Sequence, residues 1–355
     1  MNSQPIYLPA VDEVRITLVM DNSLDLLIPS TEVAQRFLFS PKWLQKFQTK
    51  PGLFDGPLPF AEHGYSALIS VKDEEKQGTV LFDTGASKKG ILWNMDALEI
   101  DPANIQAIIL SHGHADHALG LPGFIDRLGS RNLPLVLHPD AYLDRKLVLP
   151  DGIELGLPAP KKQDLRRENI EIIESVGPSM LVDGMLLVSG EITRTTDFEK
   201  GFPIHFAHRH DSWEPDPLIM DDQCAIINLK DKGLVIVTGC GHSGIINIIR
   251  NAQRITGIEE IYAVIGGFHL SGAVFEPIIP ETISALKLIN PRYVMPGHSY
   301  WLESITPAFT SYARRVYPEQ CWHDANFEIK PAGPLTNSVA NYEGMPPGVA
   351  HAGIF

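Results

Sequence analysis

The chain has 355 residues, of which 44% are apolar and 20% are charged, and its formal net charge is −14. This composition is typical of a globular protein rather than of a disordered or membrane-spanning one. Lysine and arginine never form a run longer than a pair, and the net charge is strongly negative. The sequence therefore disfavours binding to nucleic acid or to an anionic membrane.

The N-terminal sequence and the cysteines indicate a cytoplasmic location. MNSQPIYLPAVDEV has neither the basic nor the apolar region of a signal peptide, and no segment reaches the roughly 18 apolar residues of a membrane helix. The odd number of cysteines and the absence of a Cys-x-x-Cys pair favour a reducing compartment. We expect a cytoplasmic protein whose partner is a small-molecule substrate; its oligomeric state stays open.

Short β-branched segments alternate with helical segments along the chain. Strands are predicted at 14–20, 65–71, 79–82, 107–110, 133–138, 224–229, 233–239 and 261–266. Helices are predicted at 31–48, 243–256 and 280–289. This alternation indicates a layered α/β domain whose functional residues lie in loops at the strand ends.

The domain organisation is predicted from the distribution of proline, glycine and charge. Residues 150–180 mix all three without a long apolar run, so they indicate an insertion or a lid rather than a second core. We expect one domain over 1–325 with an insertion around 141–215. The segment 326–355 is rich in proline and glycine, which predicts a C-terminal tail.

The segment LSHGHADHALG at 110–120 holds four potential metal ligands within six positions. His112 and His114 follow an apolar strand and are separated by one residue, so both imidazoles can point the same way. Asp116 and His117 come directly after them. Imidazole and carboxylate suit zinc and similar cations, and four such groups exceed what one tetrahedral ion takes from so short a loop. The spacing therefore predicts two adjacent metal ions.

The pattern His-x-His-x-Asp-His resembles the signature of the metallo-β-lactamase superfamily. Three further segments resemble motifs of that family, namely FDTG at 82–85, IVTGC at 236–240 and VMPGHS at 294–299. The resemblance is closest to the branch named for the archaeal dihydropterin-methyl-ribofuranosyl-aminobenzene phosphate synthase. It is carried by VMDNSLD at 19–25, EHGYSALI at 62–69, TGCGHSGIINI at 238–248 and GGFHL at 266–270. It implies an α/β fold, a four-layer αββα sandwich with a dinuclear metal site at one edge of the sheets.

The resemblance also implies a ligand set. His112 and His114 would hold the first metal together with a third histidine. Asp116, His117 and a late histidine, for which His298 is the natural choice, would hold the second.

For the third ligand of the first site we favour His242, because it follows a strongly apolar strand and precedes a helix. The superfamily often places this histidine ahead of its fourth motif, and the residues that compete for the role on that ground are His205, His208 and His210.

The chain departs from the common pattern at the end of the fourth-motif strand. Most hydrolases of the superfamily have a bridging aspartate there, whereas this chain has Thr238, Gly239 and Cys240. A thiolate of Cys240 is a possible additional ligand of the second metal, and the alternatives are a bridge of water alone or a small buried apolar residue.

Three residues are candidates for catalytic roles. Asp116 would both bind metal and orient the nucleophile or accept its proton. Asp83 would hold a ligand imidazole or the loop backbone, and His269 would face the substrate or support the ligands. Outside these three, His63 would lie in a similar position. The remaining histidines, for which we predict a surface or tail position without a function, are His138, His323 and His351.

Two ions about 3.5–4 Å apart lower the pKa of a bridging water and stabilise developing negative charge. We therefore expect a dinuclear hydrolase in which a metal-bound hydroxide attacks a small, anionic ester or phosphoester. Zinc is the expected metal, with manganese, iron or magnesium as alternatives. The branch implies a second reading, transferase-type displacement of diphosphate from a pterin derivative, for which the available aromatics are Trp93, Trp213 and Trp301. A third reading is a non-catalytic metal-binding sensor.

Overall fold

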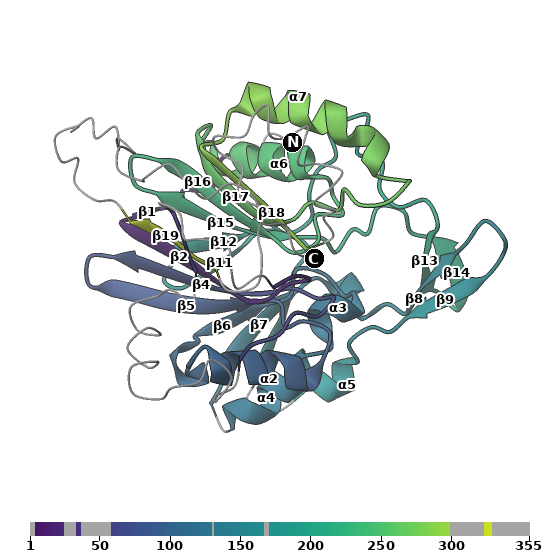
Figure 1. Ribbon diagram of the computed structural model, residues 1–355, viewed down its shortest axis with the longest axis horizontal. Helices are drawn as coiled ribbons and strands as arrows, with labels where there is room; N and C mark the ends of the chain where they lie inside the picture. The colour runs from purple at the N-terminus through teal and green to yellow at the C-terminus, as the bar shows by residue number, and fades with distance from the viewer. Residues whose placement is uncertain are drawn as a thin grey trace, which may run out of the picture.

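Two β-sheets lie face to face in the computed structural model, and helices cover the outer face of each sheet (Figure 1). The structure describes residues 4–24, 33–36, 58–129, 131–166, 170–298 and 323–328. Within these residues, one sheet has eight strands in the order β10-β7-β6-β5-β4-β2-β19-β3. The other has seven, in the order β11-β12-β15-β16-β17-β18 with β1 beside β15. The predicted four-layer αββα sandwich is confirmed.

The eight-stranded sheet mixes parallel and antiparallel pairs, and helices α2 (Lys88–Ala97) and α4 (Leu121–Leu128) cover it. Its strands are β2 (Glu13–Met20), β3 (Ala34–Arg36), β4 (Ser66–Asp73), β5 (Lys76–Phe82), β6 (Ala107–Ile109), β7 (Leu133–Leu137), β10 (Ile170–Glu174) and β19 (His323–Glu328). The short helices α3 (Ala115–Ala118) and α5 (Lys162–Leu165) lie on the same side of the molecule (Figure 1).

The seven-stranded sheet is covered by α6 (Ile245–Thr256) and α7 (Ile279–Ile289). Its strands are β1 (Ala10–Val11), β11 (Ser179–Leu181), β12 (Leu186–Val188), β15 (Cys224–Leu229), β16 (Gly233–Thr238), β17 (Ile261–Gly267) and β18 (Tyr293–Gly297). Short 3₁₀ turns are found at Pro102–Asn104, Pro139–Tyr142 and Glu276–Ile278.

Strand β16 shows how the sequence produces buried strands. Leu234 and Ile236 pack against the layer of α6 and α7, whereas Val235 and Val237 pack against the opposite sheet. Successive side chains of a strand point to opposite faces, so a strand covered on both faces reads as a continuous apolar run. The core therefore consists of three apolar interfaces, one between the sheets and one beneath each helical layer.

All eight predicted strands are present, and the helices predicted at 243–256 and 280–289 correspond to α6 and α7. The helix predicted at 31–48 is wrong where the chain is described, because Ala34–Arg36 forms β3. Ala34 pairs with Ala325 of β19, far away in the sequence. Pairing with a distant strand here overrides the local helical periodicity. The rest of 31–48 lies outside the described residues.

A third, smaller sheet projects to the side of the sandwich (Figure 1). It consists of β8 (Arg145–Val148), β9 (Glu154–Leu157), β13 (His205–Arg209) and β14 (Ser212–Pro215), in the order β14-β13-β8-β9. All four strands fall within the predicted insertion at 141–215, but β10, β11 and β12 of the same interval extend the two main sheets. Of the predicted tail at 326–355, the structure describes only residues 326–328, the end of β19. No helix in the described part of the chain is long and apolar enough to cross a membrane.

Candidate metal centre

The loops that carry the candidate residues follow strands whose carboxyl ends meet at one edge of the sandwich. In the eight-stranded sheet, β5 runs parallel to β6 with Phe82 beside Ile109, so both strands end at the same level. In the seven-stranded sheet, β16, β17 and β18 run parallel in the same way. The residues at the ends of these five strands are, in chain order, Asp83, the segment 110–117, Cys240 with His242, His269 and His298.

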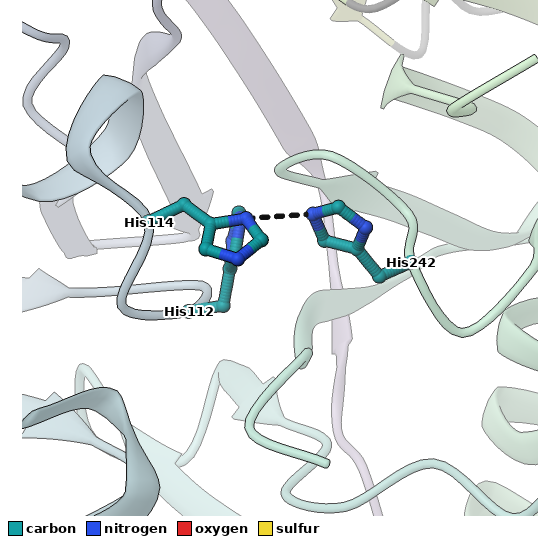
Figure 2. A group of neighbouring side chains, drawn as sticks. All are labelled: His112, His114 and His242. Carbon is teal, nitrogen blue, oxygen red and sulfur yellow. Dashed lines mark hydrogen bonds between the residues drawn. The ribbon is translucent and has the colours of Figure 1, made fainter. Parts of the chain in front are cut away.

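His112, His114 and His242 form the first group of side chains (Figure 2). Their ligand atoms all lie within 4.8 Å of one another, and His114 Nδ1 is 3.0 Å from His242 Nε2. The hydroxyl of Ser111 donates to Asp83 Oδ2 at 2.6 Å, so its oxygen is left to accept from His112 Nδ1 at 2.9 Å. The Nε2 of His112 therefore carries a lone pair, and it is buried without a hydrogen-bond partner among the described residues.

Asp116, His117 and His298 form the second group. His298 Nε2 lies 3.0 Å from Asp116 Oδ2 and 3.1 Å from His117 Nε2. On the outer side of the group, His117 Nδ1 donates to Asp83 Oδ2 at 2.7 Å and His298 Nδ1 donates to Asn22 Oδ1 at 2.8 Å. In the neutral form of each ring, Nε2 therefore carries a lone pair that faces the middle of the group.

This arrangement fits a divalent metal. Lone pairs that face one another at hydrogen-bond distance repel unless a cation or a proton lies between them. Metal-binding histidines in proteins usually donate their other ring N–H to an oxygen acceptor, which fixes the tautomer, and His112, His117 and His298 show this pattern. The rings of His112 and His117 are 4.3 Å apart, so the two groups adjoin.

Burial keeps the histidines of the first group uncharged. It lowers the pKa values of His112, His114 and His242 well below the usual range. Burial also lowers the pKa of His298 to about 4. Neutral imidazole is the form that binds metal, so these four rings are ready to bind at pH 7.

His117 differs from the other histidines. Burial alone would lower its pKa, but the carboxylates of Asp116 and Asp83 outweigh burial and hold it well above the usual range. Burial would raise the pKa of Asp116, yet His117 and His298 hold it well below its usual range. The second group is thus a place that favours positive charge, which a metal ion would supply in place of a proton.

Cys240 and His269 lie beside both groups. The Sγ of Cys240 is 3.1 Å from His269 Nδ1. Cys240 shares one set of close ligand atoms with His112 and His117, and another with His242 and His269. Burial lowers the pKa of His269 to about 3, and its Nε2 is buried without a hydrogen-bond partner among the described residues.

A cavity of about 450 Å³ opens beside the candidate centre. His242 and His269 form part of its wall, and much of the rest is apolar. The apolar residues that line it are Phe198, Phe268, Leu270, Val274, Phe275 and Ile278. Carboxylates of Asp197, Glu199 and Glu281 and the ammonium of Lys200 complete the wall. A small molecule bound in this cavity would contact the candidate centre directly.

His63 lies at the outside of the second group. Its side chain is 71% exposed, and its Nε2 is 3.5 Å from Asp116 Oδ2. Together with Asp116 and His298 it forms a set of close ligand atoms. An exposed imidazole in this place is accessible to a molecule from the solvent.

The structure separates the three histidines that compete with His242. His205 is buried, and its Nε2 lies 2.9 Å from His114 Nε2. His208 packs against the ring of Trp213 in the third sheet, and His210 is exposed. Of these four histidines, only His242 joins His112 and His114 in a set of close ligand atoms among the described residues.

Of the other histidines, His138 is buried, against the predicted surface position, because its ring bonds Glu191 and the backbone N–H of Asp140. His323 lies in β19, and His351 lies outside the described residues.

Two glycines allow the loops to approach closely. A Cβ at Gly113, between His112 and His114, would lie 2.0 Å from the carbonyl oxygen of Ala141. A Cβ at Gly239 would lie 2.1 Å from Ser111 Oγ. Both distances are far below van der Waals contact, so neither position accommodates a side chain.

Several supporting residues were not predicted. Asp221 accepts a hydrogen bond from the backbone N–H of Gly113 at 2.7 Å and forms an ion pair with buried Arg145. Asp21 accepts from the backbone N–H of His298 at 3.0 Å. The signals in the sequence were the segment VMDNSLD at 19–25, which contains Asp21, and the carboxylates directly before an apolar strand at 221–222.

Comparison with known proteins agrees with this site. Residues 62–212 match the Metallo-beta-lactamase superfamily. The chain is 34% identical over 247 residues to the 7,8-dihydropterin-6-methyl-4-(beta-D-ribofuranosyl)-aminobenzene-5'-phosphate synthase of Methanocaldococcus jannaschii, covering 68% of this chain and 82% of the relative. The chain belongs to the metallo-β-lactamase superfamily. Its buried groups of histidine and cysteine side chains suit a divalent metal site.

Two further relatives are similar over most of the chain. An uncharacterized protein of the same organism is 30% identical over 248 residues, which cover 70% of this chain and 87% of the relative. The crystal structure of a metal-dependent hydrolase of the beta-lactamase superfamily has the same fold, with a TM-score of 0.64 and 22% identity. That similarity covers 89% of this chain and 99% of the other.

Proposed function

We propose that the protein is a dinuclear hydrolase that uses two divalent ions, zinc in the first instance, on a small anionic ester or phosphoester. The observation that carries this proposal is the direction of the hydrogen bonds. The outer nitrogens of His112, His117 and His298 donate to oxygen acceptors, so their inner nitrogens face two adjoining groups of ligand atoms. Such preorganised donor sets are typical of metal sites.

His112, His114 and His242 would hold the first ion, and Asp116, His117 and His298 the second. When bound, the ions supply Lewis-acid polarisation of the substrate and activation of water. Because imidazole ligands carry no charge when they bind metal and Asp116 supplies one negative charge, two divalent ions would leave the centre positively charged, which favours an anionic substrate.

Asp116 has a second role in the proposal. Its side chain is 21% exposed, so the carboxylate can also bind a water molecule and accept its proton. Asp83 is fully buried and bonds Ser111 and His117, so it positions ligands and does not touch the substrate.

His269 is the proposed contact to the substrate. It lines the cavity, and its Nε2 is free of partners among the described residues, so a polar group of a substrate can bond to it. Cys240 takes the place of the bridging aspartate in this proposal. Its sulfur belongs to sets of close ligand atoms in both groups, which supports a role as an additional ligand.

The first experiment measures metal content and turnover together. Protein purified without chelator and reconstituted with zinc or manganese should bind close to two equivalents by elemental analysis. The loaded protein is then tested against phosphodiester, lactone, thioester and β-lactam substrates. A stoichiometry near zero would contradict the proposal.

A second candidate function follows from the similarity to the synthase of Methanocaldococcus jannaschii. The matched region covers 82% of the length of that protein. In this reading the centre displaces diphosphate from a pterin derivative. The aromatic side chains of the cavity are Phe198, Phe268 and Phe275, rather than Trp93 or Trp213. Release of diphosphate from a dihydropterin-methyl diphosphate, dependent on the aminobenzene co-substrate, would favour this function over hydrolysis.

A further inference from the structure

A contact between two imidazoles links the third sheet to the candidate centre. His205, the first residue of β13, places its Nε2 2.9 Å from the Nε2 of His114. Both rings are buried, at 0% and 9% relative exposure respectively. One of these two nitrogens must therefore donate and the other accept, and the surroundings decide which.

The direction of this hydrogen bond follows from the other side of the His205 ring. Its Nδ1 lies 2.9 Å from the carbonyl oxygen of Asp216, and a carbonyl oxygen can only accept. The proton of neutral His205 is thus on Nδ1, and its Nε2 carries a lone pair. His114 must donate from its own Nε2, which leaves the Nδ1 of His114 with a lone pair.

That lone pair points into the first group. The Nδ1 of His114 lies 3.0 Å from His242 Nε2 (Figure 2), whereas the other ring nitrogen of His114 faces His205. His114 is the one ring of the His-x-His pair that has no oxygen acceptor in this role, since His112 uses Ser111.

We propose that His205 is a positioning residue that holds His114 in the tautomer required for metal binding through Nδ1. This inference rests on the proposed metal site. His205 is not itself a ligand in this arrangement, because its only lone pair is used by His114. In agreement, no set of close ligand atoms among the described residues includes His205.

The third sheet holds His205 rigidly enough for this role. The backbone N–H of Asp216 donates to the carbonyl oxygen of His205 at 2.8 Å, and Arg209 of β13 holds the Asp216 carboxylate at 3.1 Å. Arg145 of β8 pairs with Asp221, which in turn binds the backbone of Gly113. The third sheet therefore supports the metal loop at two adjacent residues.

The test compares variants that keep or remove the acceptor. In His205→Gln the amide oxygen can still accept from His114, whereas His205→Phe retains a ring without any acceptor. The matched controls are His208→Gln and His208→Phe on the same strand. Zinc affinity is measured by competition with a chelator, and Co²⁺ absorption spectra report the geometry of the bound ion.

We expect His205→Phe to bind the ion of the first group about 10–100-fold less tightly, with an altered Co²⁺ spectrum, and to keep a stoichiometry of two at high zinc. His205→Gln should stay within a few-fold of the wild type, as should both controls. If His205→Phe does not fold, as judged by thermal denaturation of the metal-free protein, His205→Leu replaces it.

Two results would overturn the inference alone. Loss of one whole equivalent of metal in both His205→Gln and the apolar variant would make His205 a ligand, and unchanged affinity in both would remove any role. A wild-type protein that binds no divalent metal would instead overturn the proposed function on which the inference rests.

Discussion

At the scale of single residues, an outer hydrogen bond decides which ring nitrogen of His112, His117 and His298 faces the centre. Ser111, Asp83 and Asn22 accept from His112, His117 and His298 respectively. A neutral imidazole has one proton, so fixing it on the outside leaves the inside free to bind a cation. The predicted ligands can therefore be tested one side chain at a time.

Asp116→Ala should lower turnover on any substrate found by about 10²–10⁴-fold, the usual contribution of a positioned acid or base. The protein should stay folded, because the side chain is partly exposed and leaves the sheets intact. Asp96→Ala, which removes an exposed carboxylate of α2, is the control. Activity of Asp116→Ala within a few-fold of the wild type would show that the nucleophile is activated elsewhere.

His242→Ala and His298→Ala should each reduce the bound metal from about two equivalents to about one, and the double variant should lose both ions. A divalent ion with three protein ligands loses most of its affinity when one ligand is removed. His269→Ala should keep both ions and lose turnover. Elemental analysis measures the metal equivalents bound by each variant. This ligand set would be refuted if His208→Ala lost one equivalent and His242→Ala did not.

At the scale of elements, the turn after β5 holds the loop after β6. Asp83 accepts from the backbone N–H and the hydroxyl of Ser111, both at 2.6 Å, and from His117. Its φ of 58° lies in the left-handed region, which aspartate and asparagine tolerate better than most residues. One buried carboxylate thus orients a ligand from each of the two groups, His112 through Ser111 and His117 directly.

Asp83→Asn should therefore change hydrogen bonding without adding backbone strain. An amide cannot accept from all three donors, so the metal-free protein should lose about 1–3 kcal/mol of unfolding free energy. Metal affinity should fall about 10–100-fold. Denaturant unfolding and chelator competition measure the two effects. Asp231→Asn, an exposed turn residue with a φ of 57°, should change neither quantity.

At the scale of the whole molecule, the centre joins the two sheets. Asp21 follows β2 of the eight-stranded sheet, and His298 follows β18 of the seven-stranded sheet. The carboxylate of Asp21 accepts from the backbone N–H of His298 at 3.0 Å. Burial raises the pKa of Asp21 to about 6 from its ordinary value of 3.8. The stability of the assembled sandwich should therefore depend on pH through this residue.

The native protein binds a proton at Asp21 more readily than the unfolded chain does. Its contribution to stability is therefore complete below pH 4 and is lost as the pH rises towards 6, by at most about 3 kcal/mol. The side chain of the Asp21→Asn variant does not titrate in this range. The difference in unfolding free energy between the wild type and this variant should therefore fall between pH 4 and 6 and be constant above pH 7. Urea unfolding of both metal-free proteins between pH 4 and 8 tests this. A constant difference, or one that grows with pH, would contradict it.

Much of the fold and the centre could be predicted because the signals are local. Apolar runs of strand length predicted eight of the strands in the two main sheets. The spacing of His112, His114, Asp116 and His117 predicted a metal-binding loop. His242 and His298 were chosen because they follow apolar strands, and strand ends are where loops carry functional groups. The structure brings these six side chains together, as it does Cys240 and His269.

Only the tertiary structure decided which atoms face one another. The bonds from Gly113 to Asp221 and from His298 to Asp21 join residues 108 and 277 positions apart, and no local pattern marks such pairs. For the same reason 34–36 became a strand beside β19, and His205 came to lie against His114. Residue type and spacing determine which groups can bind a metal, because that chemistry belongs to the side chain. Their tautomers and partners depend on neighbours that only the folded chain supplies.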